Sequence, residues 1–210
     1  MALVNKRRNK TAREAAPESA SVGRSLNDLL ADLGAADAVS RRQAARELAT
    51  HPKAAPAMCG LLEDERDGSV RSVIFTSLIR LKTRTVVELL APHLRSEDAA
   101  LRNAVVEALQ EMPEAIEPFM ESLLNDQDSD VRISAVTILG ALPHPRAPEW
   151  LSGVIRSDPH INVCAAAVDC LAEVGDEAAI PLLQALTQRF PDEPFIDFAV
   201  SAAIRRIEGQ

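Results

Sequence analysis

Aromatic residues are scarce in this chain of 210 residues, where they make up 3% of the sequence and tyrosine is absent. The apolar fraction is nevertheless 47%, and it comes mainly from alanine, leucine, valine and isoleucine. Such a composition favours helices. The sequence also lacks apolar runs near the roughly 18 residues of a membrane span, and it lacks the apolar core of a secretory signal. We therefore expect a helical, soluble protein of the cytoplasm.

Cysteine is equally sparse. The three cysteines, Cys59, Cys164 and Cys170, are odd in number and form no C-x-x-C pair. This argues against a disulfide framework and against a zinc site. Because free cysteine is among the residue types most often buried, we expect three reduced thiols inside the protein.

Residues suited to catalysis are few. The histidines are His51, His93, His144 and His160, and two of them, His51 and His144, precede prolines in turns, where solvent-exposed side chains are expected. Glycine-rich phosphate loops and the G-x-S-x-G motif are missing from the sequence. We therefore predict a protein without catalytic activity, metal or cofactor.

Charge divides the chain into two parts. Residues 1 to 24 contain six basic and two acidic residues, whereas the remainder contains 17 basic and 29 acidic residues. The first part is poor in apolar residues and is predicted to be a disordered basic tail, followed by one folded unit over residues 25 to 210. The acidic unit should repel nucleic acid, so only the tail is a candidate to bind it or another acidic surface.

A repeat of about 30 residues runs through the acidic part. Strong aliphatic marker residues recur 30 to 33 positions apart, at Leu48, Leu78, Leu109, Leu139, Leu171 and Ile204. Most units add an aliphatic residue eight positions before the marker, a small or aliphatic one near four before, and another three after. These offsets place apolar side chains on one face of a helix. Each unit therefore contains an amphipathic helix, which we call its second helix.

A shorter apolar stretch precedes each second helix and is predicted to form a first helix. Four of these stretches carry a proline where a first helical turn tolerates it, at Pro56, Pro118, Pro148 and Pro181. The opening stretch from Ser25 to Gly34 has a capping serine, an aspartate three residues later and a terminal glycine. The pattern predicts six helix pairs stacked as an α-solenoid.

These units resemble HEAT repeats, and in particular the short HEAT-like repeats first described in phycobilisome lyases. The resemblance rests on DGSVRSVIFTSLIRL from residue 67, DSDVRISAVTILGAL from residue 128 and NVCAAAVDCLAEVGDEAAIPLLQAL from residue 162, and it covers residues 25 to 210. Tetratricopeptide and ankyrin signatures, which have similar periods, do not occur. The resemblance implies an all-α fold, a right-handed α-solenoid of about six HEAT-like pairs, but it does not imply one function.

An acid and an arginine recur where second helices start. The acids are Asp67, Asp98, Asp128, Asp130 and Asp158, and the arginines are Arg41, Arg71, Arg102 and Arg132. We predict that the acids cap the helices and that each arginine contacts acids of an adjacent repeat. In repeats five and six the arginine position holds Cys164 and Asp197, so this ladder should fade towards the C-terminus.

Second helices line the concave face of an α-solenoid, so residues opposite their buried stripe are predicted to face a groove. The candidate partner-binding residues are Arg42, Arg46, Thr76, Arg80, Asn103, Glu107, Glu111, Thr137, Asp169 and Glu173, with Ser72, Ile133 and Ala165 at equivalent positions. This groove is predicted to be basic at its N-terminal end and acidic from the third repeat onward. Such a gradient could orient an extended or helical partner by charge.

Three aromatic residues of the C-terminal half are assigned to the core. Trp150 is expected to pack between repeats rather than anchor a partner. Phe195 and Phe198 are expected to cover the inner face of the last repeat, with an apolar docking end as the alternative.

Together these features favour a noncatalytic scaffold, adaptor or assembly factor that binds another protein through the groove. Enzymes with similar repeats need features that are missing: deoxyhypusine hydroxylase needs His-Glu pairs, and a HEAT-like DNA glycosylase needs a basic, aromatic groove. A bilin lyase-type chaperone or enzyme subunit is the alternative that the resemblance permits, and it would require a tetrapyrrole and usually a partner subunit. Binding of nucleic acid or another acidic surface through residues 1 to 24 is a third possibility.

Overall fold

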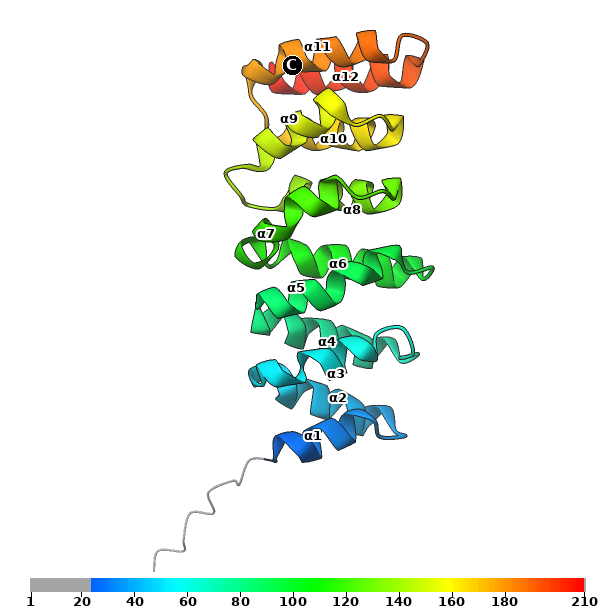
Figure 1. The fold of residues 1–210 in the computed structure, drawn as a ribbon, viewed down its shortest axis with the longest axis vertical. Coiled ribbons are helices and arrows are strands. Elements are labelled where there is room, and N and C mark those ends of the chain that lie inside the picture. The colour runs from blue at the N-terminus through cyan, green and yellow to red at the C-terminus, as the bar shows by residue number, and fades with distance from the viewer. Residues whose placement is uncertain (1–23, 210) are drawn as a thin grey trace, which may run out of the picture.

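The computed structural model describes residues 24 to 209, and within them the backbone forms twelve α-helices and no strand. The helices stack in chain order from α1 at one end to α12 at the other (Figure 1). The prediction of an all-α solenoid of six helix pairs is confirmed. The predicted basic tail lies outside the described residues except for Arg24, and the boundary at residue 24 stays a prediction.

Each repeat consists of a first and a second helix. The first helices are α1 (Leu26–Leu33), α3 (Ala55–Gly60), α5 (Arg84–Leu90), α7 (Pro113–Leu124), α9 (Ala147–Ser157) and α11 (Ile180–Arg189). The second helices are α2 (Ala38–Glu47), α4 (Gly68–Leu81), α6 (Ala99–Gln110), α8 (Ser129–Ala141), α10 (Ile161–Val174) and α12 (Pro194–Ile207). Short 3-10 turns adjoin four of the helices, at Leu48–Thr50, Pro52–Ala54, Ala91–Arg95 and Glu177–Ala179.

One continuous apolar core runs through the stack. Each second helix packs on the second helix of the next repeat. The markers from Leu48 to Leu171 are buried in the core, whereas Ile204 is partly buried. Burying a leucine side chain stabilises a fold by roughly 1.5–3 kcal/mol, so each buried marker contributes to the stability of the stack. Within residues 24 to 209, no helix is long and apolar enough to cross a membrane.

Helix starts follow the sequence signals in most repeats. Ser25 caps α1 in a capping box with Asp28, and prolines occupy the first turns of α3, α9 and α11. The prediction for Pro118 is wrong, because α7 begins five residues earlier at Pro113 and contains Pro118 in its interior. Pro113 occupies the first-turn position, where proline needs no hydrogen-bond partner for its nitrogen.

The cysteines lie in or beside the core. Cys59 and Cys164 are buried and Cys170 is partly buried. Burial raises the pKa of Cys59 to about 12 and that of Cys170 to about 11, so both thiols stay protonated near neutral pH. Cys170 also marks a close approach of two helices, because a Cβ atom added to Gly140 of α8 would lie 2.5 Å from its sulfur.

Two of the sequence-based expectations for ring side chains are wrong. His144 is not solvent-exposed, since its side chain is 11% exposed and its ring stacks on Trp150 at 5.0 Å. Trp150 itself is buried, as expected. Phe195 and Phe198 do not cover the core, because they project from α12 with 56% and 70% of their surface exposed.

Candidate functional site

Most of the predicted groove residues lie together on the exposed side of the second helices, which we call the second-helix face. The exposed members are Arg46, Ser72, Thr76, Arg80, Asn103, Glu107, Glu111, Thr137, Asp169 and Glu173. Arg42 and Ile133 are partly buried. Ala165 is 5% exposed, so the expectation that it faces a groove is wrong; its methyl group is too short to extend past the side chains around it.

Two hollows indent this face. The first lies between α4 and α6, has a volume of about 550 Å³, and is lined by Phe75, Thr76, Ile79, Glu107 and Glu111 among others. The second lies between α10 and α12, has a volume of about 490 Å³, and is lined by Asp169, Ala172, Glu173, Ala202, Ala203, Arg205 and Arg206. Of the predicted residues, Thr76, Glu107 and Glu111 line the first hollow, and Asp169 and Glu173 line the second. Arg42, Arg46, Arg80, Asn103 and Thr137 line neither, so the predicted residues do not line one continuous groove.

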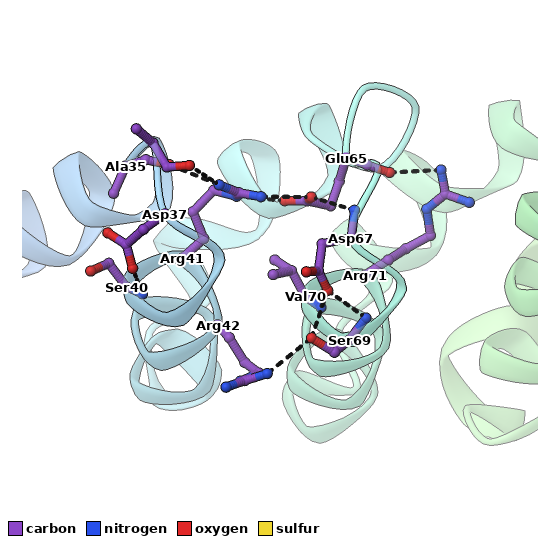
Figure 2. A network of polar contacts seen from close by, with 11 residues as sticks. Ala35, Asp37, Ser40, Arg41, Arg42, Glu65, Asp67, Ser69, Val70 and Arg71 are labelled. Carbon is purple, nitrogen blue, oxygen red and sulfur yellow. Dashed lines mark hydrogen bonds and ion pairs between the residues drawn. The ribbon is translucent and has the colours of Figure 1, made fainter.

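Charge along the second-helix face changes as predicted over the first three repeats, but not at the far end. Arg42 donates to the Ser69 hydroxyl at 3.0 Å (Figure 2), while Arg46 and Arg80 are exposed. On α10, Glu173 forms an ion pair with Arg206 of α12 at 2.6 Å. The arginines of α12 were missed by the sequence analysis, and they make the last hollow mixed in charge rather than acidic.

Beside this face runs the predicted ladder of arginines. Figure 2 shows Arg41 of α2 reaching Glu65 of the next repeat, with its two nitrogens 2.7 and 2.9 Å from the carboxylate oxygens. The same guanidinium donates to the carbonyl of Ala35 at 3.0 Å. Hydrogen bonds from Arg41 lower the pKa of the buried Glu65 carboxyl. Glu65 was not singled out from the sequence, although it stands two residues before a capping aspartate.

Two further arginines form the same kind of contact with an acid of the next repeat. Arg71 donates to Asp98 at 2.8 Å and to the carbonyl of Glu65 at 2.9 Å. Arg132 contacts Asp158 at 2.7 and 3.2 Å. Both arginines bridge consecutive repeats, so the prediction of contacts with acids of an adjacent unit is confirmed for Arg41, Arg71 and Arg132.

Arg102 departs from the ladder. It donates to the carbonyl of Ser96 at 2.5 Å, but among the described residues it forms no ion pair. The acid available in the next repeat, Asp126, is instead paired with Arg95. The expected bridge from Arg102 to an acid is therefore wrong, and Arg95 supplies the cation for Asp126 instead.

In the fifth repeat the arginine position is filled from another helix. Cys164 directs its sulfur at the carbonyl of Asp158 at 3.3 Å. Arg189 of α11 donates to that carbonyl at 2.7 Å and also to the carbonyl of Ile155. Arg189 of the following repeat thus supplies the guanidinium donor that is missing at position 164, where the earlier repeats have an arginine.

The capping aspartates explain most second-helix starts. Asp67, Asp98 and Asp128 accept hydrogen bonds from backbone amides at the starts of α4, α6 and α8, and Asp37 does the same for α2 although it was missed. Asp158 does not cap α10, contrary to prediction. It ends α9, is 7% exposed, and serves as the partner of Arg132.

The family model for HEAT repeats matches residues 26–113 and 116–203. Most of the solenoid is included in this match. The chain belongs to the HEAT-repeat family.

A relative of this HEAT-repeat chain is the bilin biosynthesis protein PecE of Mastigocladus laminosus. The two are 29% identical over 150 residues, which make up 69% of this chain and 55% of the relative. The chain therefore matches about half the length of that protein. The prediction that the chain is not an enzyme is contradicted by this relative, whose name places it in bilin biosynthesis.

Solved structures with some likeness include other repeat proteins. An engineered protein has a TM-score of 0.41 at 19% identity, covering 89% of this chain and all of that chain. A designed armadillo repeat protein has a TM-score of 0.39 at 16% identity over 87% and 100% of the chains. The complex of CpcE and CpcF of phycocyanin lyase from Nostoc sp. PCC7120 has a TM-score of 0.36 at 18% identity over 94% and 100%. TM-scores this low add nothing to the family assignment.

Proposed function

We propose that this HEAT-repeat chain is a bilin-handling subunit of the bilin lyase type. The observation that carries the proposal is the 150-residue similarity to a bilin biosynthesis protein. In this role a bilin would be a substrate that the chain binds and presents, and a partner subunit would complete the machinery.

The hollow between α4 and α6 offers groups that suit a linear tetrapyrrole. Its volume of about 550 Å³ falls in the range of ligand pockets, roughly 300–1,000 Å³. Phe75 and Ile79 of α4 give its lining an apolar part, and Glu107 and Glu111 contribute carboxylates. Ring N–H groups of a bilin can donate to such carboxylates.

A bilin titration tests this proposal. Adding biliverdin or phycocyanobilin to the purified full chain should give a saturable change of the absorbance spectrum, and Glu107→Gln with Glu111→Gln should weaken uptake about tenfold, the loss of one or two charge-assisted hydrogen bonds. The matched control is Glu173→Gln in the hollow between α10 and α12, which should leave uptake unchanged. An unaltered spectrum at saturating bilin, with circular dichroism showing a folded protein, contradicts bilin handling.

We also propose that the basic end of the second-helix face binds a protein partner. The supporting observation is that Arg46 and Arg80 are exposed on neighbouring second helices with Arg42 between repeats. At protein interfaces, charge complementarity sets specificity and association rate more than affinity. An acidic segment of a partner fits this end.

Charge reversal at Arg42, Arg46 and Arg80 should abolish capture of that partner in a pull-down. The control reverses Arg66, Arg84 and Arg156, which are exposed away from this face and change the net charge equally. Equal capture by both triple variants would show that net charge, rather than this face, determines binding.

A further inference from the structure

The largest exposed apolar side chains in the described part of the chain are two phenylalanines on one helix. Phe195 and Phe198 of α12 are 56% and 70% exposed. Large exposed apolar groups that cluster, in contrast to scattered ones, mark interaction sites in soluble proteins. Packing in the core therefore does not explain why two phenylalanines occur at these positions.

The repeat register places this pair on the second-helix face. Phe198 stands six residues before its marker, Ile204, in the position that Arg42 and Ser72 hold in the first two repeats. Phe195 stands nine residues before the marker, where the first repeat has the exposed Val39. Both phenylalanines thus extend the candidate binding face to the sixth repeat.

The pair does not lie where one repeat packs on the next. Helix α8 faces α10 of the following repeat through the positions three before and one after its marker, where Val136 and Gly140 approach Cys170. On α12 these two positions hold the exposed, polar Ser201 and Arg205. A further repeat of the same kind has no apolar surface to pack on there, so packing of the stack does not account for Phe195 and Phe198.

The spacing of the apolar residues and the charges beside them indicate which kind of partner segment could bind to the two phenylalanines. Phe195, Phe198 and the partly buried Ala202 follow one another at three and four residues, so they form a row along α12. Such a row matches the stripe that one amphipathic helix presents to another. Three exposed acids adjoin the phenylalanine end of the row, at Asp192, Glu193 and Asp197.

We propose that Phe195, Phe198 and Ala202 form a docking row for an amphipathic helix of a partner protein. The apolar stripe of that helix packs on the row, and basic residues at one of its ends lie against the three acids, which steer its approach and fix its direction. This interaction is separate from bilin handling in the hollow between α4 and α6 and does not depend on it.

The test uses the full chain and a designed probe. The probe is a fluorescein-labelled helical peptide of about 18 residues, five turns of helix, with leucines at positions i, i+3 and i+7 and lysines at one end. Fluorescence anisotropy should show saturable binding, and Phe198→Ser should weaken the Kd at least about tenfold, as expected for a hot-spot aromatic. Val39→Ser, at the register position of Phe195 in the first repeat and 66% exposed, is the matched control and should leave the Kd unchanged.

Peptide variants separate the proposed contact from attraction to an acidic protein. Replacing the lysines by glutamates, or the leucines by serines, should each remove binding. Equal loss in Phe198→Ser and Val39→Ser, or no loss in either, would overturn the docking row. An unlabelled peptide of residues 1–24 serves as competitor. Displacement of the probe at lower concentration than the unlabelled probe itself would show that the occupant is the chain's own N-terminal segment, which also overturns the partner assignment.

Discussion

The first four repeats and the last two start their second helices by different means. Aspartates cap α2, α4, α6 and α8, whereas His160 and Glu193, which precede α10 and α12, form no side-chain cap. The arginine of the first turn is likewise present in the first four repeats and is replaced by Cys164 and Asp197 in the last two. The stack nevertheless continues through all six repeats (Figure 1).

Comparing the repeats shows which contact of the ladder arginines is constant and which varies. The hydrogen bond to a backbone carbonyl is constant, and the ion pair with an acid of the next repeat varies. Each ladder arginine donates to the backbone carbonyl six residues before it, and Arg102 does so without any carboxylate partner. In the fifth repeat Arg189 supplies the same kind of bond from another helix. Because an unpaired buried carbonyl destabilises a fold, we infer that satisfying this carbonyl is the main role of the ladder. The ion pairs between repeats add to it where an acid is available.

The largest expected effect on stability comes from removing the buried ion pair between Arg132 and Asp158. Arg132→Ala leaves Asp158, which is 7% exposed, without its cation and should lower the free energy of unfolding by about 3 kcal/mol. Arg102→Ala is the control, since it loses a carbonyl bond but no ion pair, and should cost about 1 kcal/mol. Urea denaturation measures both. Equal losses would mean that the buried carboxylate contributes nothing of its own.

The second prediction concerns the close contact between α8, in the last of the first four repeats, and α10, in the first of the last two. Gly140→Ala places a Cβ atom 2.5 Å from the sulfur of Cys170 and should cost about 2 kcal/mol through overpacking. Combining it with Cys170→Ala should recover much of that loss, because the sulfur is gone. Gly153→Ala in α9 meets no atom within 4 Å and should be neutral or slightly stabilising. Additive losses in the double variant would contradict the assigned clash.

The third prediction tests the replacement arginine. Arg189→Met removes the donors to the carbonyls of Ile155 and Asp158 and should cost about 1–2 kcal/mol. Cys164→Arg restores an arginine at the ladder position, so it should be less destabilising in the Arg189→Met background than in the wild-type chain, where two guanidinium groups would compete for one carbonyl. The measurement is a double-mutant cycle by thermal or urea unfolding. Simple additivity would show that the two positions do not substitute for each other.

The sequence predicted what depends on local periodicity and missed what depends on neighbours. The markers, the helix pairs and the caps at Asp67, Asp98 and Asp128 follow from spacing and from hydrogen-bonding requirements within a few residues. The role of Asp158, the use of Arg189 and the pairing of Arg95 in place of Arg102 depend on which side chain of another repeat lies nearer, and this distance is not encoded in any one unit. Phe195 and Phe198 were assigned to the core because a terminal repeat needs its inner face covered, whereas in the structure they are 56% and 70% exposed.

The smallest expected effect is a difference in pH dependence between the aspartate-capped second helices and α12. The Asp37 pKa is lowered by the amide of Ser40, the Asp67 pKa by the Ser69 hydroxyl and by amides, and the Asp98 pKa by Arg71 and by amides. A folded pKa below the unfolded value of about 4 stabilises the fold fully above that value, and the stabilisation disappears as the pH falls through the folded pKa. Between pH 5 and pH 3, hydrogen exchange corrected for intrinsic rates should therefore show α2, α4 and α6 losing protection before α12, whose start has no side-chain cap. Asp67→Asn should remove the pH dependence at α4 alone, and an equal loss of protection in α12 would mean that the caps do not cause the difference.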